Sequence, residues 1–323
     1  MDEAWRPRAT LATLQARARC LAAIRAFFAA RGLLEVETPQ LSAAATTDPA
    51  LASLATRWPA AGGTQRYLHT SPEFPMKRLL AAGSGDIWQL ARVFRDGERG
   101  RRHHPEFTLL EWYRVGWDHH RLMDEVVELV TLLLQGHALA PAERLTYRDA
   151  FATHAGIDPF SADAAAWRAC ARRHCIDCSG LDDAERDGWR DLLLSHAVEP
   201  ALGLGRLTLL HDYPASQAAL ARVRPGDPPL AERFELYWQG VELANGFHEL
   251  ADAAEQRRRM DADLARRRAL GLATVPPDGH FLAALEAGLP ACAGVALGVD
   301  RLLMLQLGLD SIDAVLAFPI ERA

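Results

Sequence analysis

A short basic segment between two stretches of strand character is the part of this sequence best suited to chemistry. Residues 86–94 read as an apolar strand that ends at Arg95, and residues 106–115 return as a second strand with alternating polar and apolar positions. The loop between them carries Arg99, Arg101, Arg102, His103 and His104. Such a hairpin suits a nucleoside triphosphate, because the basic groups can face the phosphates while Phe107 stacks on a base. The alternative is a charged hairpin on the surface.

A glycine-spaced segment near the end of the chain also leads to an arginine. Residues 294–301 read Gly-Val-Ala-Leu-Gly-Val-Asp-Arg, a strand that runs into a helix with Arg301 at the junction. The glycine at position 298 allows the backbone to approach a ligand closely. Because glycine-rich strand–helix junctions are common, the segment predicts a ligand site only together with the basic hairpin.

Two carboxylates stand between these segments. Glu235 and Glu242 lie on two consecutive predicted strands, residues 233–239 and 241–245. Both could reach one Mg²⁺–phosphate cluster, since a magnesium ion bound to ATP usually takes one or two protein carboxylates and keeps several waters. The alternative is that both carboxylates simply face solvent.

A cluster of cysteines could hold a metal, but its spacing argues against this. Cys170, Cys175 and Cys178 form C-x4-C-x2-C beside His174, and no second pair follows at ligand spacing. Residues 167–174 also read as an amphipathic helix that would bury Cys170. We therefore expect structural cysteines, with a metal site as the alternative.

The composition limits the class of protein. The chain has 323 residues, of which 49% are hydrophobic, enough for a sizeable core. Its net charge of −6 gives no general basic surface for RNA. The apolar stretches are too short to cross a bilayer and there is no signal peptide, so we expect no membrane association. Five cysteines, an odd number, favour the reducing cytoplasm.

The elements that must position these residues begin with a helix. Residues 10–31 are periodic in apolar positions, with Thr10 as the expected N-cap and Gly32 as the expected end. They lead into a predicted strand, residues 33–39, which stops at a proline. Residues 119–205 read as mostly helical, with segments near 119–135, 146–155, 163–174 and 184–201.

These segments resemble the class II aminoacyl-tRNA synthetases, most closely the lysyl branch. The hairpin around Arg95 resembles motif 2, residues 294–301 resemble motif 3, and residues 10–39 resemble motif 1, which forms the dimer interface in that family. The resemblance implies one α+β catalytic domain over residues 1–323, with an antiparallel sheet flanked by helices and a mostly helical insertion around 119–205. Only about ten residues precede the motif 1 unit, so we expect no OB-fold anticodon domain.

The resemblance implies ATP and Mg²⁺ as ligands. Arg95 would bridge the substrate carboxylate and the α-phosphate, while Arg301 and His103 would hold the outer phosphates. Glu235 and Glu242 match family residues that hold magnesium. The other ATP-binding positions that it implies are Asp96, Gly97, His104, Phe107, Leu243 and Gly298. Where the family has Asn-Glu after the motif 2 arginine, this chain has Asp96-Gly97, which leaves Glu98 as a possible substitute.

Further positions imply the amino acid that is activated. Glu73, Tyr113 and Glu249 resemble the family's anchors for two amino groups, with Asn245 beside them, which suits a dibasic substrate. Lysyl-tRNA synthetases typically have Ala-Pro-Glu where this chain has Ser71-Pro72-Glu73, and Gly in place of Ala296. Serine and alanine at these sites resemble the free-standing elongation factor P β-lysine ligases.

This second resemblance implies a cytoplasmic homodimer that activates (R)-β-lysine, and α-lysine more weakly. The acceptor would be a lysine side chain of elongation factor P, with no tRNA involved. Two alternatives stay open: a truncated lysyl-tRNA synthetase that charges tRNA, and a catalytically silent paralogue that binds lysine or a nucleotide.

Overall fold

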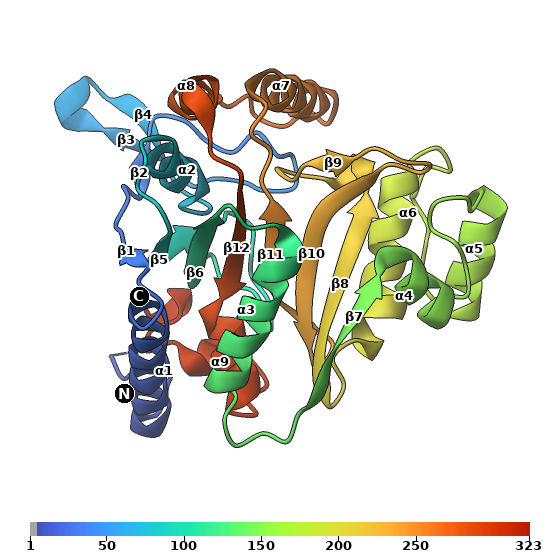
Figure 1. Ribbon diagram of the computed structural model, residues 1–323, viewed down its shortest axis with the longest axis horizontal. Helices are drawn as coiled ribbons and strands as arrows, with labels where there is room; N and C mark the ends of the chain where they lie inside the picture. The colour runs from blue at the N-terminus through green and yellow to red at the C-terminus, as the bar shows by residue number, and fades with distance from the viewer. Residues whose placement is uncertain (1–4) are drawn as a thin grey trace. The chain divides into compact units, whose positions relative to one another are not determined.

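The structure, a computed structural model, describes residues 5–323 and divides them into two compact units (Figure 1). The first unit contains the residues up to Gly116, Leu250–Cys292 and Ala296–Ala323. The second contains Trp117–Glu249 and Ala293–Val295. Strand β12 (Cys292–Gly298) therefore contributes residues to both units. The expectation of one domain over the whole chain stays a prediction.

The first unit opens with helix α1 (Leu11–Ala29), as the sequence predicts. Thr10 is extended, and its side-chain oxygen accepts a hydrogen bond from the backbone N–H of Thr13 at 3.1 Å. This satisfies one of the N–H groups that a helix start leaves without a partner. The helix buries Cys20, Ile24, Phe27 and Phe28 in the core.

The strand after α1 is shorter than residues 33–39. Only β1 (Leu34–Glu35) pairs with its neighbour, in parallel with β5 (Ile87–Phe94). One more hydrogen bond joins the N–H of Val36 to the carbonyl of Trp88 at 2.9 Å. The chain then leaves the sheet edge before Pro39, which has no N–H to offer a neighbouring strand.

The predicted basic hairpin is confirmed. Strands β5 and β6 (Glu106–Val115) pair antiparallel in an unbroken register from Ile87↔Tyr113 to Phe94↔Glu106. Both strands are largely buried. Because their pairing is regular up to Phe94 and Glu106, the position of the loop between them is set by two buried strands.

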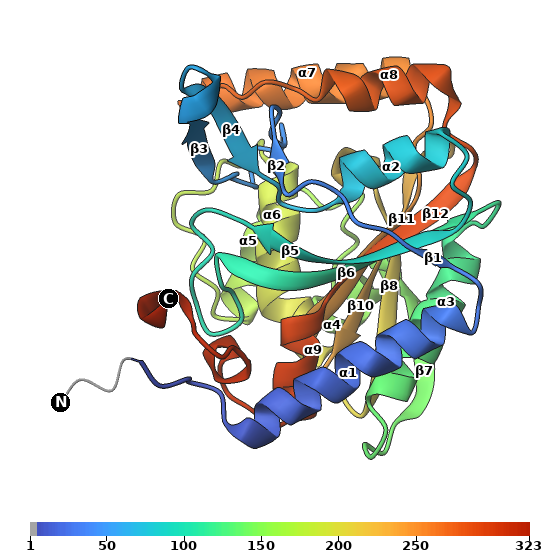
Figure 2. The same cartoon turned by 90° about the vertical axis from the view of Figure 1, so that its left-hand side faces the viewer.

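The rest of the first unit packs around helices α2, α7 and α8. Helix α2 (Glu73–Ala81) packs on α8 (Gly279–Gly288), where the rings of Phe74 and Phe281 stack 4.5 Å apart. Helix α7 (Ala253–Ala269) lies beside α8 (Figures 1 and 2). The remaining elements are β2 (Leu41–Ser42), β3 (Ala55–Trp58), β4 (Thr64–Leu68), α9 (Val299–Gln306), and the 3₁₀ turns Pro59–Ala61, Ile312–Val315 and Ile320–Arg322. Strand β4 pairs antiparallel with both β2 and β3.

The second unit contains a mostly antiparallel set of strands. Strand β10 (Leu230–Trp238) pairs antiparallel with β11 (Val241–His248) and with β8 (Arg206–Pro214). Strand β7 (Ala140–Thr146) joins β8 in parallel, and the short β9 (Val223–Arg224) pairs with β10. The antiparallel pairs in both units, with helices beside them, confirm the predicted α+β class.

The predicted helices of this unit are present. They are α3 (His119–Leu133), α4 (Tyr147–His154), α5 (Ala164–Arg173) and α6 (Arg186–Leu193), which continues as a π-helical turn, Leu194–Val198, and a 3₁₀ turn, Glu199–Ala201. Helices α4, α5 and α6 gather next to β7 and β8 (Figure 1). Their core includes Tyr147, Phe151, Trp167, Trp189, Tyr213 and Tyr237. Cys170 is buried in α5, as expected, and its thiol donates to the carbonyl of Ala155 at 3.2 Å.

Strand β7 was not predicted from the sequence. Its residues, Ala-Pro-Ala-Glu-Arg-Leu-Thr, are mostly exposed and show no apolar alternation, because the strand lies at the edge of the sheet and buries little of itself. Among residues 5–323, no helix has the length and apolar character needed to cross a membrane.

Candidate active site

In the first unit, the hairpin places Arg95 against an aromatic ring. The guanidinium carbon of Arg95 lies 5.0 Å from the centre of the Phe107 ring. Its Nη1 is 3.4 Å from Glu98 Oε1, and its Nε donates to the carbonyl of Thr70 at 3.4 Å. Arg95 therefore lies beside the residue that the sequence assigned to base stacking, and its guanidinium reaches the residue just before Ser71.

Arg301 meets the basic loop, although 198 residues separate it from His103 in sequence. Its Nη2 donates to Nε2 of His103 at 2.7 Å, and its Nε donates to the carbonyl of Arg102 at 3.1 Å. Because a guanidinium can only donate, His103 accepts at Nε2 and carries its proton on Nδ1. The two predicted outer-phosphate residues thus lie together near the surface, where Arg301 supplies the positive charge and His103 can donate from Nδ1.

Three other basic side chains of the loop, those of Arg99, Arg101 and His104, bind neighbouring parts of the first unit. Arg99 binds Asp313 at 2.8 Å and Glu321 at 2.6 Å, and Arg101 donates to the carbonyl of Asp310. His104 is only 3% exposed, and its Nε2 accepts from the N–H of Ile320 at 2.9 Å. Its Nδ1 then donates to the carbonyl of Glu106 at 2.6 Å. Since both ring nitrogens of His104 have partners, the geometry favours an anchoring task over the predicted contact with ATP.

Asp300, next to Arg301, joins three elements and was missed in the sequence. Its side chain is 1% exposed, pairs with Arg17 of α1, and accepts from the N–H of Thr108 in β6 at 2.6 Å. Burial, with the nearby charge of Arg92, lowers the pKa of Arg17 to about 10. The only sequence signal was an acidic residue between an apolar strand and Arg301. Asp300 therefore holds the start of α9, and Arg301 with it, in place.

The Ser71-Pro72-Glu73 turn opens α2 and contacts a buried lysine. Ser71 Oγ accepts from the N–H of Glu73 at 3.1 Å. Glu73 Oε1 lies 2.6 Å from Nζ of Lys77, the chain's only lysine, which is 1% exposed. The i,i+4 spacing of Glu73 and Lys77 in the sequence is the signal for this pair. Glu73 already pairs with the ammonium group of Lys77. An amino group of a bound substrate would therefore have to share this carboxylate with Lys77.

Three further predicted residues of the first unit are Tyr113, which is buried, and Ala296 and Gly298, which are partly buried. Tyr113 is 2% exposed, and its hydroxyl donates to Glu111 Oε1 at 2.7 Å. Ala296 packs with Phe107 on the cluster of Ala91, Val93 and Leu109. Gly298 caps α9 with a φ of −76°, which any residue can adopt, so backbone conformation alone does not require a glycine there.

In the second unit, the two predicted magnesium ligands lie on neighbouring strands. Glu235 is opposite Asn245 in the pairing of β10 and β11, and a bulge after Leu236 brings Glu242 opposite Tyr237. Paired residues in a sheet point to the same face. The negative charge of Glu242 also helps to raise the pKa of Tyr237, after burial and Glu235 among others.

Glu235 is held in a dense network of donors. Its Oε2 accepts from the hydroxyls of Tyr213, at 2.6 Å, and of Tyr237, while its Oε1 pairs with Arg233. Burial and the charge of Glu235 raise the pKa of both tyrosines well above the usual range. Arg233 also donates to Asn245 Oδ1 at 3.3 Å. Since both oxygens of Glu235 are engaged, coordinating magnesium there would have to disturb this network, so Glu235 fits a magnesium ligand less well than the sequence suggested.

The end of β11 carries the other predicted residues of this unit. Leu243 is 2% exposed and Glu249 is 3% exposed. Between them, Gly246 has no room for a side chain, because a Cβ there would lie 2.5 Å from the Phe234 ring and 3.0 Å from the carbonyl of Gly294. The glycine of the Asn245-Gly246-Phe247 segment therefore permits close packing between strands.

Comparisons with known proteins agree along the whole chain. A model of the family described as tRNA synthetases class II (D, K and N) matches residues 4–322. An elongation factor P–(R)-β-lysine ligase of Vibrio vulnificus is 51% identical over 326 residues, with all of both chains covered. Ligases of the same name from Vibrio cholerae and Klebsiella pneumoniae are 50% and 51% identical, with 99% of this chain and 98% of each relative covered.

Proposed function

The chain belongs to the class II tRNA synthetase family of the D, K and N type, and from this we propose that it is an ATP-dependent ligase that joins (R)-β-lysine to a lysine side chain of elongation factor P. The observation that carries the proposal is identity at about half of all positions, from end to end, with relatives of that name. The contact between Arg301 and His103 supports it, because an ATP-dependent ligase needs a cation and N–H donors at the phosphates.

The first step forms an adenylate. The carboxylate of (R)-β-lysine attacks the α-phosphorus of ATP, a P–O bond forms, and pyrophosphate leaves. The carboxylate is already ionised at pH 7, so this step needs no general base. The residues contribute alignment and charge: Arg95 orients the carboxylate and the α-phosphate, while Arg301 and His103 hold the outer phosphates.

In the second step, the amine of the acceptor lysine attacks the mixed anhydride, an amide bond forms, and AMP leaves. Glu73, Glu249, Tyr113 and Asn245 are the proposed partners of the substrate's amino groups. Magnesium, when bound, would neutralise phosphate charge, and Glu242 is its proposed carboxylate ligand, with Glu235 as the second.

We also propose a cytoplasmic homodimer. Leu11, at the start of α1, is 71% exposed, and Leu34, in β1, is 55% exposed, so the unit predicted to form the interface carries apolar side chains that a partner could cover. All five cysteines are free, as expected in a reducing compartment. Sedimentation at micromolar protein should give the mass of a dimer, and a monomer would contradict this part of the proposal.

Pyrophosphate exchange that depends on the amino acid tests the activity. (R)-β-Lysine should drive the exchange better than α-lysine, and Arg301→Ala should lower its rate by about 100- to 1000-fold, the usual cost of losing one charge contact in such a site. Arg57→Ala, on the exposed strand β3, is the control and should exchange at the normal rate. Near-normal exchange by Arg301→Ala would defeat the ATP-site assignment.

The acceptor is tested separately, with radioactive (R)-β-lysine and either elongation factor P or lysine tRNA. Labelling of the protein supports the proposal. Labelling of the tRNA alone would favour the truncated synthetase, and no exchange with any lysine isomer would favour the silent paralogue.

A further inference from the structure

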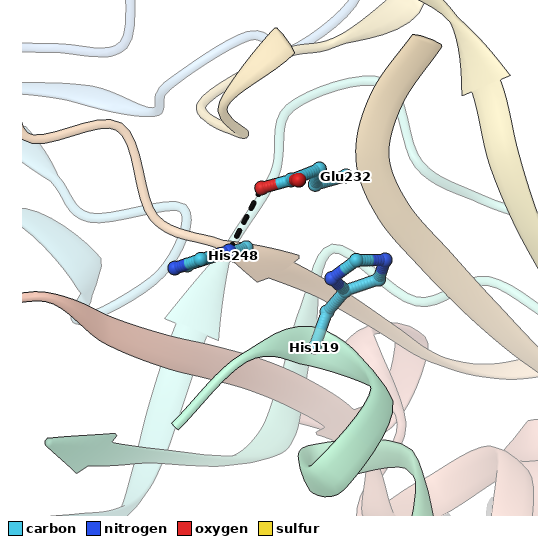
Figure 3. A group of neighbouring side chains, drawn as sticks. All are labelled: His119, Glu232 and His248. Atoms are coloured by element: carbon cyan, nitrogen blue, oxygen red, sulfur yellow. Dashed lines mark ion pairs between the residues drawn. The ribbon is translucent and has the colours of Figure 1, made fainter. Parts of the chain in front are cut away.

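The second unit contains a group of potential metal ligands that the proposed reaction does not use. His119 is the first residue of α3, Glu232 lies in β10, and His248 is the last residue of β11. One ligand atom from each lies within 4.8 Å of the others. Figure 3 shows the three side chains as neighbours, with the ion pair between Glu232 and His248 as a dashed line.

His119 is a buried polar side chain without a hydrogen-bond partner. It is 2% exposed, and neither ring nitrogen has a partner among residues 5–323. Buried polar groups are nearly always satisfied, because leaving one unpaired costs free energy. The ring lies 6.2 Å from that of His248 and roughly parallel to it. His119 therefore has an N–H and a nitrogen lone pair that both lack a partner in the described part of the chain, and the lone pair could bind a metal.

Glu232 and His248 complete the set from the neighbouring strands. Nδ1 of His248 lies 2.8 Å from Oε2 of Glu232, and each side chain is 14% exposed. Two imidazoles and one carboxylate form a typical ligand set for Zn²⁺ with one position left open for water. Zinc bonds of about 2.0–2.1 Å place tetrahedral ligand atoms about 3.3 Å apart, so ligand atoms that lie within 4.8 Å of one another would move closer when zinc binds.

The surroundings keep the two imidazoles neutral. Burial is the largest cause that lowers the pKa of His119 to about 3, and the neighbouring imidazoles of His120 and His248 disfavour a further positive charge beside them. Burial and the charge of Arg222 lower the pKa of His248. The ring of His120 lies 4.1 Å from that of His119 and 5.5 Å from that of His211, and Asp118 and Asp212 are the nearby acids. A neutral imidazole is the form that binds a metal.

Arg222 is the cation that now faces the group. Its Nη1 donates to Nε2 of His248 at 3.1 Å, and its Nε lies 3.7 Å from Oε2 of Glu232. The side chain is 51% exposed, so it can turn into solvent at little cost when another cation arrives. Arg222 and a metal ion therefore compete for the same carboxylate.

We propose that His119, Glu232 and His248 bind a zinc ion, with water as the fourth ligand. The ion would tie the start of α3 to β10 and β11, and so hold the end of the strand that leads into Glu249. The proposal does not depend on the reaction, since it concerns residues to which the reaction gives no role.

The test is zinc binding by full-length protein without a histidine tag, stripped with a chelator and titrated against a competing chromophoric indicator, with no ATP or lysine present. One equivalent should bind. Glu232→Gln, which keeps the shape of the side chain, and His248→Gln should each weaken the affinity by about tenfold or more. Arg222→Gln should strengthen it. His280→Gln, at an exposed site in the first unit, is the matched control and should change nothing.

Cobalt reports on the ligand type. Co²⁺ in this site should give visible bands of a four-coordinate ion without the near-ultraviolet charge-transfer band of thiolates, and Cys175→Ser/Cys178→Ser should leave the spectrum unchanged. The proposal is wrong if zinc binds no more tightly than it does to ordinary sites on the protein surface. It is also wrong if Glu232→Gln binds zinc as tightly as the wild type does. It is also wrong if the cysteine variant loses the site. Circular dichroism checks that each variant is folded. Because a substitution of the buried His119 could unfold the protein, the zinc affinity of Glu232→Gln is the deciding measurement.

Discussion

The pair of Arg17 and Asp300 should be among the most costly contacts of the first unit to break. Arg17→Met removes the guanidinium but keeps most of the apolar stem. Asp300 would then stay at 1% exposure, and among residues 5–323 the N–H of Thr108 would be left to compensate its charge. Breaking a buried ion pair by removing one partner costs about 3–5 kcal/mol. We expect about 3 kcal/mol, because the N–H of Thr108 remains at 2.6 Å.

Removing the charge of Asp300 instead should lower the free energy of unfolding by less. Asp300→Asn keeps an oxygen that can accept from Thr108, and it leaves the cation on a side chain that is 16% exposed and can reach water. A loss of about 1.5–3 kcal/mol is typical for a hydrogen bond to a charged group. In Arg17→Met/Asp300→Asn neither charge is left alone, so the double variant should be more stable than the sum of the single effects by about 2 kcal/mol.

Urea unfolding followed by circular dichroism measures all four proteins, and pyrophosphate exchange shows whether Arg301 has moved. We expect the single variants to lose activity together with stability, because Asp300 holds the helix turn that carries Arg301. A coupling free energy below about 0.5 kcal/mol would mean that the two residues act independently and would refute the reasoning.

Three further predictions follow from single contacts. Ser71→Ala/Ala296→Gly should move the preference toward α-lysine by about 1–3 kcal/mol in kcat/KM without abolishing activation, and unchanged preference would contradict the specificity argument. Gly246→Ala should destabilise the protein by about 1–3 kcal/mol, because the new Cβ meets the Phe234 ring at 2.5 Å, whereas Gly279→Ala, which has open space, should be nearly neutral in the same urea titration. His119 has a pKa of about 3 in the folded protein and about 6.5 when unfolded. Between these two pH values His119 binds more protons in the unfolded chain than in the folded protein. Above pH 6.5, protonation of His119 should therefore take nothing from the free energy of unfolding of the metal-stripped protein. The protein should lose up to about 1.4 kcal/mol per pH unit as the pH falls toward 3, and His119→Gln should flatten that slope in urea titrations at several pH values.

The sequence by itself determined the parts of the protein that depend on neighbours along the chain. The start of α1 at Thr10, the helices at 146–155 and 163–174, and the β5–β6 hairpin were all predicted, because caps and apolar periodicity act over a few residues. Motif order and spacing also indicated the family, which the end-to-end match confirms.

Only the tertiary structure determined which side chains lie in contact with one another. Five basic residues in one loop are equivalent in the sequence, yet His103 meets Arg301 while Arg99 binds the C-terminal turn. Asp300 finds Arg17 across 283 positions, and His119 faces Glu232 and His248 from another element. These contacts depend on distance and burial in the folded chain. A charged side chain is paired or removed from water only in the folded chain, so no local sequence pattern could reveal these contacts.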